Sequence, residues 1–68
     1  MDEYFRLIDR YIKANPNQQN PETYYRYLGL DRSIELLKKA LKENLVFSYI
    51  DAGENVLDGG EVTLIKKP

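Results

Sequence analysis

Apolar and charged residues alternate with a helical period at the start of the chain, over Asp2–Ala14. Apolar side chains share one side of the expected helix, and the charged residues fall largely on the other. The apolar stripe is made of Phe5, Ile8 and Ile12, with Tyr4, Leu7 and Tyr11 beside it. Asn15-Pro16 ends the pattern because a residue before proline avoids the α region. The pattern predicts a first helix over Asp2–Ala14 and a polar link over Asn15–Asn20.

A second helix is expected after this link. Asn20 can cap it, and Pro21 suits the first helical position, where its missing N–H would have no partner. The helix would run to about Leu28, and Gly29 fits the left-handed position that closes many helices. The side of this helix expected to enter the core carries Tyr24, Tyr27 and Leu28. These signals predict a short helix that ends in a tight glycine turn.

A third helix is expected directly after the turn, from Arg32 to about Glu43. Asp31 can cap its start, and Asn44 can end it in the left-handed region. Its core stripe is made of Ile34, Leu37 and Leu41, with Leu36 and Ala40 flanking. The opposite face of this helix is expected to be polar and exposed.

The chain then changes from a helical period to a strand pattern. Leu45–Ile50 and Glu61–Ile65 are rich in β-branched and aromatic residues and predict two strands. Turn signals lie between them at Ala52-Gly53 and Asp58-Gly59-Gly60. Either the two strands pair across a long loop, which we prefer, or Asn55–Leu57 adds a short middle strand. The expected fold is α+β, with three helices followed by a β-hairpin.

The composition is that of one small domain spanning residues 1–68. The absence of cysteine excludes disulfides and thiolate metal sites and favours a cytoplasmic location. No apolar run approaches the about 20 residues that span a bilayer, and the acidic start Met1-Asp2-Glu3 is unlike a signal peptide. We therefore expect no membrane association. Because so small a core has neither a disulfide nor a metal, formation of a homodimer would add stability.

No constellation of catalytic residues is visible in the sequence. Histidine, the usual general acid or base near neutral pH, is absent. Asp51-Ala52-Gly53 lacks the alternating oxygen ligands of a calcium loop, and Asp58-Gly59-Gly60 lacks the Lys-Ser/Thr of a phosphate loop. We therefore expect a non-catalytic binding module with no cofactor and no metal.

The run Leu28-Gly29-Leu30-Asp31-Arg32-Ser33 resembles the turn of many bacterial regulators. In such a turn a glycine separates two helices and a capping residue opens the second one, which sets the helices at a steep angle. The resemblance to the winged helix-turn-helix superfamily covers Glu22–Lys66 and is best over Leu28–Leu41. It implies a winged-helix-like domain that binds duplex DNA, with the third helix in the major groove. Tyr25 departs from the pattern, since a small residue usually stands four positions before the glycine.

Charge along the third helix favours a small DNA-binding regulatory protein. Between Arg26 and Lys42 the chain has five basic and two acidic residues, although a solvated helix face would look the same. The residues expected to contact DNA are Arg32 and Ser33, nearest the base edges, and Lys38, Lys39 and Lys42, nearest phosphate. Glu43–Glu61 has five acidic residues and no basic one, so the DNA backbone would repel the loop between the strands. Any DNA contact is therefore expected on the third helix alone.

A protein-interaction or dimerisation module that binds no nucleic acid is the alternative function. Tyr25 and Arg26 are contact candidates because tyrosine and arginine are enriched at protein interfaces. Val56 and Leu57 are apolar residues within the acidic loop. They either tuck under the sheet or contact a partner chain.

Overall fold

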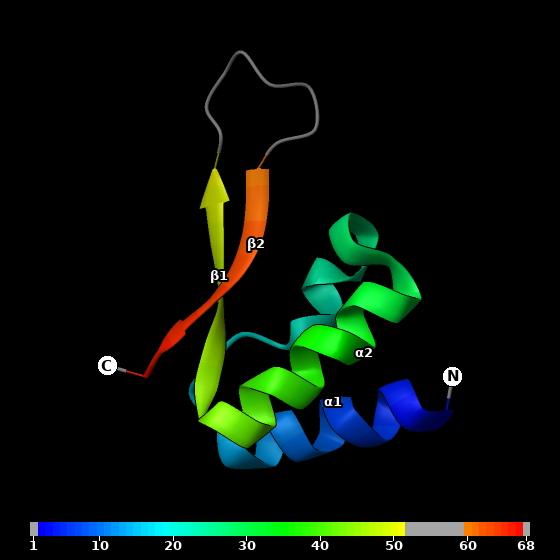
Figure 1. Cartoon of the computed structure of the whole chain (residues 1–68). Helices are drawn as coiled ribbons and strands as arrows, with labels where there is room; N and C mark the ends of the chain where they lie inside the picture. The colour runs from blue at the N-terminus through cyan, green and yellow to red at the C-terminus, as the bar shows by residue number, and fades with distance from the viewer. Residues whose placement is uncertain (1, 52–59, 68) are drawn as a thin grey trace.

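Two α-helices, one 3-10 turn and a β-hairpin follow one another in the computed structural model, which describes residues 2–51 and 60–67. The elements are α1 (Asp2–Ala14), η1 (Pro21–Tyr24), α2 (Tyr25–Glu43), β1 (Leu45–Asp51) and β2 (Gly60–Lys66). The helix α1 packs against α2, and the hairpin rises beside the C-terminal end of α2 (Figure 1). Neither helix of the described part is long and apolar enough to cross a membrane.

The prediction of three helices was wrong. Pro21–Tyr24 forms a 3-10 turn, and a single helix then runs over Tyr25–Glu43. Gly29 lies inside this helix as a kink, with φ 76° and ψ 176°. Residues 25–28 and 30–43 are two helical segments joined across this kink, and together they form the one element α2 instead of two separate helices. The structure is α+β, but its element order is not that of the expected three-helix domain.

Gly29 has the positive φ that the sequence predicted, but its ψ lies outside the left-handed helical region. This backbone conformation is essentially restricted to glycine. Asp31 was expected to cap a new helix and instead lies within α2. Its side chain makes no hydrogen bond in the described part of the chain. An acidic residue in the turn after the break still suits the helix dipole.

Two other predicted caps are confirmed. At the start of η1, the N–H of Glu22 donates to Asn20 Oδ1 at 2.9 Å, and Pro21 occupies the first position. Asn44 is left-handed, with φ 58° and ψ 49°, and its N–H donates to the carbonyl of Ala40 at the end of α2. Local backbone chemistry was therefore enough to predict these two boundaries.

The strands β1 and β2 pair antiparallel, from Leu45 opposite Lys66 to Asp51 opposite Gly60, as the preferred layout predicted. Alternate side chains of a strand point to opposite faces. The hairpin face that packs against the helices carries Phe47, Tyr49, Val62 and Leu64. The alternative middle strand over Asn55–Leu57 lies outside the described residues.

The core lies between α1, α2 and the inner face of the hairpin. Its buried side chains are Tyr4, Leu7, Ile8, Tyr11, Tyr24, Leu36, Leu37, Ala40 and Phe47. The predicted stripe of α1 was wrong at two positions, since Phe5 and Ile12 are exposed while Tyr4 and Tyr11 are buried. The reason is not local, because the hairpin packs on the side of α1 that carries Tyr11.

The Tyr11 hydroxyl joins α1 to β1. Its Oη accepts a buried hydrogen bond from the N–H of Phe47 at 3.0 Å. The Tyr11 ring meets the Phe47 ring edge-on, and the Tyr24 ring stacks on the Phe47 ring, with centroids 5.4 Å and 5.6 Å apart. In the described part of the chain β1 has a partner strand on one side only. Tyr11 therefore supplies an acceptor to an N–H at the open edge of the sheet.

Candidate functional site

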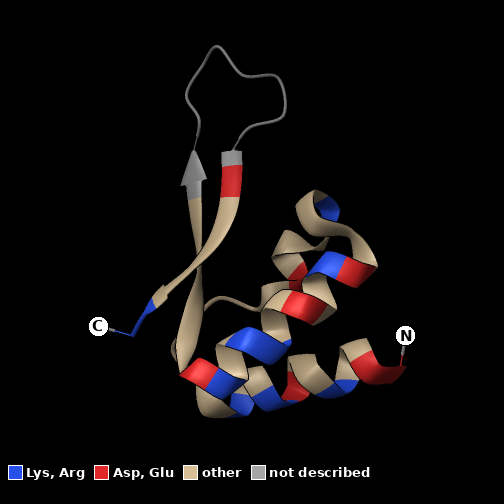
Figure 2. Ribbon diagram, in the orientation of Figure 1, with Lys and Arg blue, Asp and Glu red and all other residues tan. Residues whose placement is uncertain are grey.

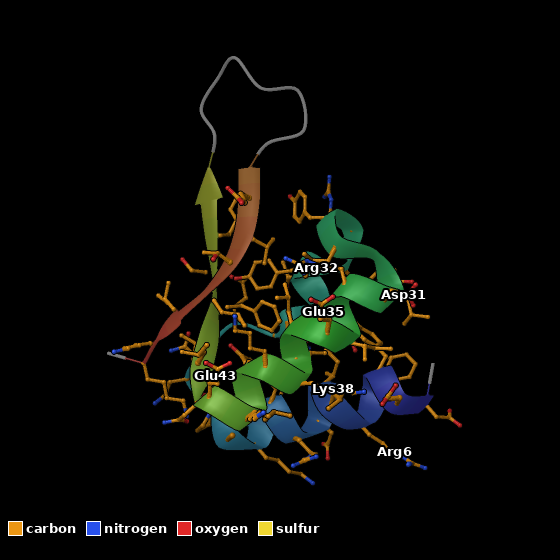
Figure 3. All side chains as sticks on the ribbon, viewed as in Figure 1. Arg6, Asp31, Arg32, Glu35, Lys38 and Glu43 are labelled. Atoms are coloured by element: carbon orange, nitrogen blue, oxygen red, sulfur yellow. The ribbon has the colours of Figure 1, made fainter. Side chains whose placement is uncertain are left out.

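The exposed face of α2 carries charges of both signs rather than a continuous positive surface (Figure 2). Arg32, expected nearest the base edges of DNA, donates from Nη1 to Glu35 Oε1 at 2.9 Å (Figure 3). An exposed pair of this kind contributes only about 0–1 kcal/mol, so Arg32 is free to leave Glu35. A DNA backbone at this half of α2 would nevertheless meet the carboxylates of Asp31 and Glu35.

Ser33 was expected on the exposed face of α2, and this prediction was wrong. The residue is buried, with 4% of its surface exposed, and within the described residues its Oγ has no hydrogen-bond partner. The buried face of α2 is made of Ser33, Leu36, Leu37 and Ala40. Ile34 and Leu41, from the predicted stripe, are only half-buried because the helix is turned relative to that stripe. Ser33 is therefore not available to a ligand at the surface.

The three lysines expected at phosphate differ in their surroundings. Lys38 Nζ pairs with Glu3 Oε2 at 2.9 Å and so links α2 to the start of α1. Lys39 and Lys42 are exposed, and across residues 2–51 and 60–67 neither has an ion-pair partner. Positive charge without a described partner therefore lies on the C-terminal half of α2.

The structure separates Tyr25 from Arg26, which were expected to share a contact surface. The Arg26 guanidinium lies over the ring of Tyr27, with Cζ 5.1 Å from the ring centroid. Tyr25 contacts Tyr4 of α1 instead. Tyr27, expected in the core, is exposed and packs on Tyr49, whereas burial of Tyr24 is confirmed. The other two contact candidates lie outside the described residues; they are Val56 and Leu57.

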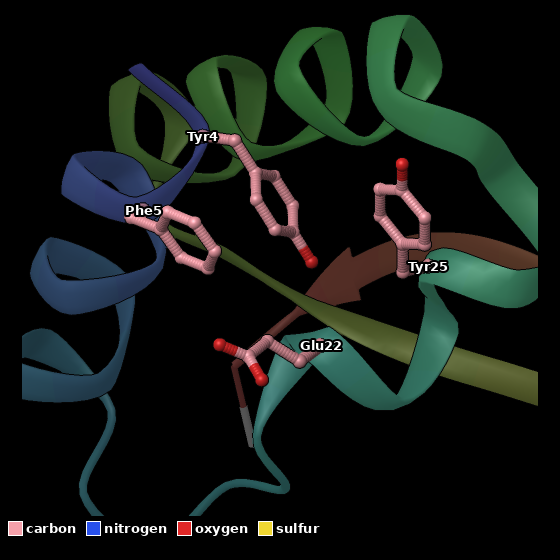
Figure 4. A pocket seen from close by; sticks show the side chains of 4 residues that line it. All are labelled: Tyr4, Phe5, Glu22 and Tyr25. Atoms are coloured by element: carbon pink, nitrogen blue, oxygen red, sulfur yellow. The ribbon is translucent and has the colours of Figure 1, made fainter. Parts of the chain in front are cut away.

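A pocket of about 240 Å³ opens where Tyr25 meets the start of α1. It is lined by Tyr4, Phe5, Glu22 and Tyr25, and we call it the Tyr4 pocket (Figure 4). The Tyr4 ring centroid lies 5.4 Å from that of Phe5 and 5.4 Å from that of Tyr25, with interplanar angles of 57° and 59°. Tilted contacts of this kind are favourable for aromatic pairs. The walls come from α1, η1 and α2.

Tyr4 is the buried wall of the pocket, with 3% of its surface exposed. Its Oη points toward the space between Glu22 and Tyr25 and has no hydrogen-bond partner in the described part (Figure 4). Burial raises the pKa of this hydroxyl from 10.0, and the nearby Glu22 and Tyr25 raise it further, so the group is neutral at physiological pH. An unpaired buried hydroxyl costs about 1–3 kcal/mol, and its retention calls for an explanation such as a ligand or a water.

The other walls of the Tyr4 pocket are exposed. Phe5 and Tyr25 have 50% and 37% of their surface exposed. Glu22 is also exposed, and its carboxylate has no ion-pair partner within residues 2–51 and 60–67. The backbone hydrogen bond from Glu22 to Asn20 holds the residue at the start of η1. Two exposed rings, an unpaired carboxylate and an unpaired hydroxyl therefore meet at one place.

Sequence reasoning identified Tyr25 as a contact residue and missed Tyr4, Phe5 and Glu22. No local pattern connects the start of α1 with η1, so the pocket itself was not predictable. The adjacent pair Tyr4-Phe5 was an available signal. Neighbouring residues of a helix point roughly 100° apart, so two adjacent rings rarely enter one core together. One of the two was bound to lie at or near the surface.

No protein-family model, curated protein or solved structure matches this chain. The winged helix-turn-helix resemblance therefore stays a prediction from the residues that carry it. In the described part of the chain, no group of three or more His, Cys, Asp or Glu residues is placed to hold a metal ion. Function must therefore be inferred from the side chains that the fold brings together.

Proposed function

We propose that this chain is a non-catalytic protein-interaction module that contacts a partner protein through the Tyr4 pocket and the surface beside it. The observation that supports this best is the exposure of Phe5 and Tyr25, two large rings held against the buried Tyr4. Aromatic side chains are enriched at protein interfaces and supply much of their binding energy. Rings that are already held in place lose little conformational freedom on binding.

Ile12 extends this surface along α1. It follows Phe5 by seven residues, so both side chains lie on the same face of the helix, and Ile12 is exposed as well. Single exposed apolar residues are ordinary, whereas a group of them indicates a contact surface. We call Phe5, Ile12 and Tyr25 together the Phe5 face.

Photo-crosslinking tests this function. A benzoylphenylalanine in place of Ile12 lies on the Phe5 face and leaves the Tyr4 pocket intact. In cells of the source organism, we expect a covalent adduct of defined mass. Phe5→Ser should reduce its yield about tenfold or more, because loss of a central interface residue costs about 2 kcal/mol or more.

The matched control is Tyr27→Ser, which removes an exposed ring outside the pocket (41% exposed, against 50% for Phe5) and should leave the adduct unchanged. Circular dichroism of each variant checks that the fold is retained. Absence of any adduct, or an adduct that is insensitive to Phe5→Ser, would contradict the proposed function.

Duplex DNA binding is the second candidate, and it is supported by the unpaired Lys39 and Lys42 on the C-terminal half of α2. Two lysines would neutralise about two phosphates, whereas strongly salt-dependent DNA-binding proteins contact about 6–10. DNA binding is the second candidate because Lys39 and Lys42 would neutralise too few phosphates for strong binding.

A titration with a mixed duplex pool tests DNA binding. At low salt we expect measurable affinity that falls as salt is raised, and Lys39→Glu with Lys42→Glu should abolish it. The same charge reversal at Arg6 and Arg10, two exposed arginines of α1 outside the predicted DNA-contact residues, is the control and should have a smaller effect. No binding at low salt would remove this candidate.

A further inference from the structure

The size of the Tyr4 pocket indicates what kind of ligand it holds. Pockets for whole small molecules typically enclose about 300–1,000 Å³. The Tyr4 pocket is smaller, at about 240 Å³. It therefore suits one side chain inserted from a partner protein better than a complete metabolite.

The aromatic walls favour a cation. The rings of Phe5 and Tyr25 contact the central Tyr4 ring at 57° and 59°, so the pocket is bordered by ring surfaces in several orientations. The face of an aromatic ring carries partial negative charge and attracts a positively charged group. The two exposed rings, Phe5 and Tyr25, supply this attraction, and the lining contains no basic residue to oppose it.

The polar atoms of the pocket require hydrogen-bond donors. The Glu22 carboxylate is negative and, among the described residues, has no cation beside it. The Tyr4 Oη, which points toward Glu22 and Tyr25 (Figure 4), also has no partner there. The Tyr4 Oη is covered in this conformation, so binding requires the exposed Glu22 side chain to move aside as the ligand enters, while the Phe5 and Tyr25 rings stay in place. A ligand with both positive charge and N–H donors satisfies both groups.

We propose that the Tyr4 pocket binds an arginine side chain of the partner protein, an inference that rests on the proposed protein-interaction function. A guanidinium is planar and weakly hydrated, stacks on aromatic rings and pairs with a carboxylate through two N–H groups. A trimethylammonium group would attract the rings and Glu22 by its charge, but it has no N–H and so would give neither Glu22 nor the Tyr4 Oη a hydrogen bond. A lysine ammonium is strongly hydrated and does not stack.

Peptide titrations followed by NMR test this inference. The isotope-labelled full chain is titrated with blocked Gly-Arg-Gly, and with the same peptide carrying citrulline, lysine or trimethyllysine in place of arginine. Citrulline keeps the shape of arginine and removes the charge. We expect the arginine peptide to shift the amide signals of the four pocket residues and to bind about tenfold more tightly than the citrulline peptide.

Variants of the pocket give a second, independent measurement. Glu22→Gln should weaken binding of the arginine peptide about tenfold, while Glu43→Gln, the same change at an exposed site outside the pocket, should have no effect. Tyr4→Phe keeps the ring and removes Oη, and should weaken binding about threefold. Because Tyr4→Phe leaves the aromatic packing in place, it separates the role of the hydroxyl from that of the fold.

Several results would overturn the inference. Equal affinity for arginine and citrulline, tighter binding of lysine or trimethyllysine, or no effect of Glu22→Gln would each do so. A dimer in sedimentation that Phe5→Ser converts to a monomer would show that a second copy covers the surface instead.

The two proposals fail in distinguishable ways. A crosslink at Ile12 that depends on Phe5, without binding of the arginine peptide, would leave the interaction function in place and reject arginine as the ligand. Arginine-specific binding without a crosslink would support the chemistry of the pocket and reject the partner function.

Discussion

Each end of α1 carries a buried tyrosine, and the two hydroxyls differ in whether they make a hydrogen bond. Tyr4 and Tyr11 are seven residues apart on one face, with 3% and 1% of their surface exposed. Tyr11 Oη accepts the N–H of Phe47, while Tyr4 Oη has no partner in the described part of the chain. The two tyrosines are similarly buried but differ in role. Tyr11 joins α1 to β1 through its hydrogen bond, whereas Tyr4 keeps a hydroxyl that can still accept one.

The neighbours of the two tyrosines explain the difference. Tyr11 lies against the open edge of β1, where a backbone N–H needs an acceptor. Tyr4 lies against η1 and the start of α2, where its neighbours are side chains, the Tyr25 ring and the Glu22 carboxylate. A backbone edge is a fixed partner within the fold, whereas exposed side chains are free to turn toward a ligand. This difference supports the proposal that the Tyr4 end of α1 is the end that binds a partner.

Tyr11→Phe should give the largest change in stability. It removes the acceptor and leaves the buried N–H of Phe47 unpaired, which costs about 1–3 kcal/mol. For a domain of this size, each kcal/mol lowers the melting temperature by about 4–8 °C. Urea unfolding followed by circular dichroism measures the loss. A loss below about 0.5 kcal/mol, within the range of ordinary surface substitutions, would mean that the hydrogen bond is not structural.

Tyr4→Phe should leave stability unchanged or raise it by up to about 1 kcal/mol, because it removes a buried hydroxyl that has no described partner. The same urea experiment compares it directly with Tyr11→Phe. Destabilisation as large as that of Tyr11→Phe would show that the Tyr4 hydroxyl is paired within the fold, for example with Glu22. The contrast between the two ends of α1 would then disappear.

The smallest expected effect is on the pH dependence of stability at alkaline pH, where the Tyr4 and Tyr11 hydroxyls lose their protons. Burial raises the pKa of both tyrosines above 10.0; the nearby Glu22 adds to this for Tyr4, while the hydrogen bond from Phe47 partly opposes it for Tyr11. The unfolded chain loses these protons first, so both contributions to stability are fully present below pH 10.0 and are lost as pH rises through the folded-state pKa values.

Tyrosinate absorbance and urea midpoints across this pH range measure that effect. Tyr4→Phe and Tyr11→Phe should each remove one late-titrating group and make the alkaline loss of stability less steep. Loss of an early-titrating group in Tyr4→Phe, instead of a late one, would show that the Tyr4 hydroxyl is exposed to water rather than buried.

Local signals predicted the boundaries of most elements. The helix α1 spans Asp2–Ala14 as predicted; β1 is one residue longer than predicted at its end, and β2 is one residue longer at each end. The caps at Asn20 and Asn44 are confirmed because each depends on a side chain or backbone conformation within a few residues. The same local signals predicted the positive φ of Gly29 correctly but wrongly made Gly29 the turn between two separate helices.

The candidate site was predicted less well. Ser33 is buried because packing against α1 and the hairpin determines which side of α2 enters the core. The predicted apolar stripe of this helix did not reveal that side. The Arg32–Glu35 pair spans three residues and was readable from the spacing, whereas the Lys38–Glu3 pair joins two helices and was not. Residues of the Tyr4 pocket come from three elements that no sequence pattern connects.

The sequence by itself therefore determined where α1, the caps and the hairpin lie, because hydrogen bonding within a few residues controls the start and end of such elements. Only the tertiary structure decided which face of each helix is buried, that Gly29 bends one helix, and that Tyr4 meets Glu22 and Tyr25. Those outcomes depend on packing between segments far apart in the chain. There the fit of side-chain volumes and the unpaired N–H of Phe47 at the edge of the hairpin decide which residues are buried, and they override the helical period of the sequence.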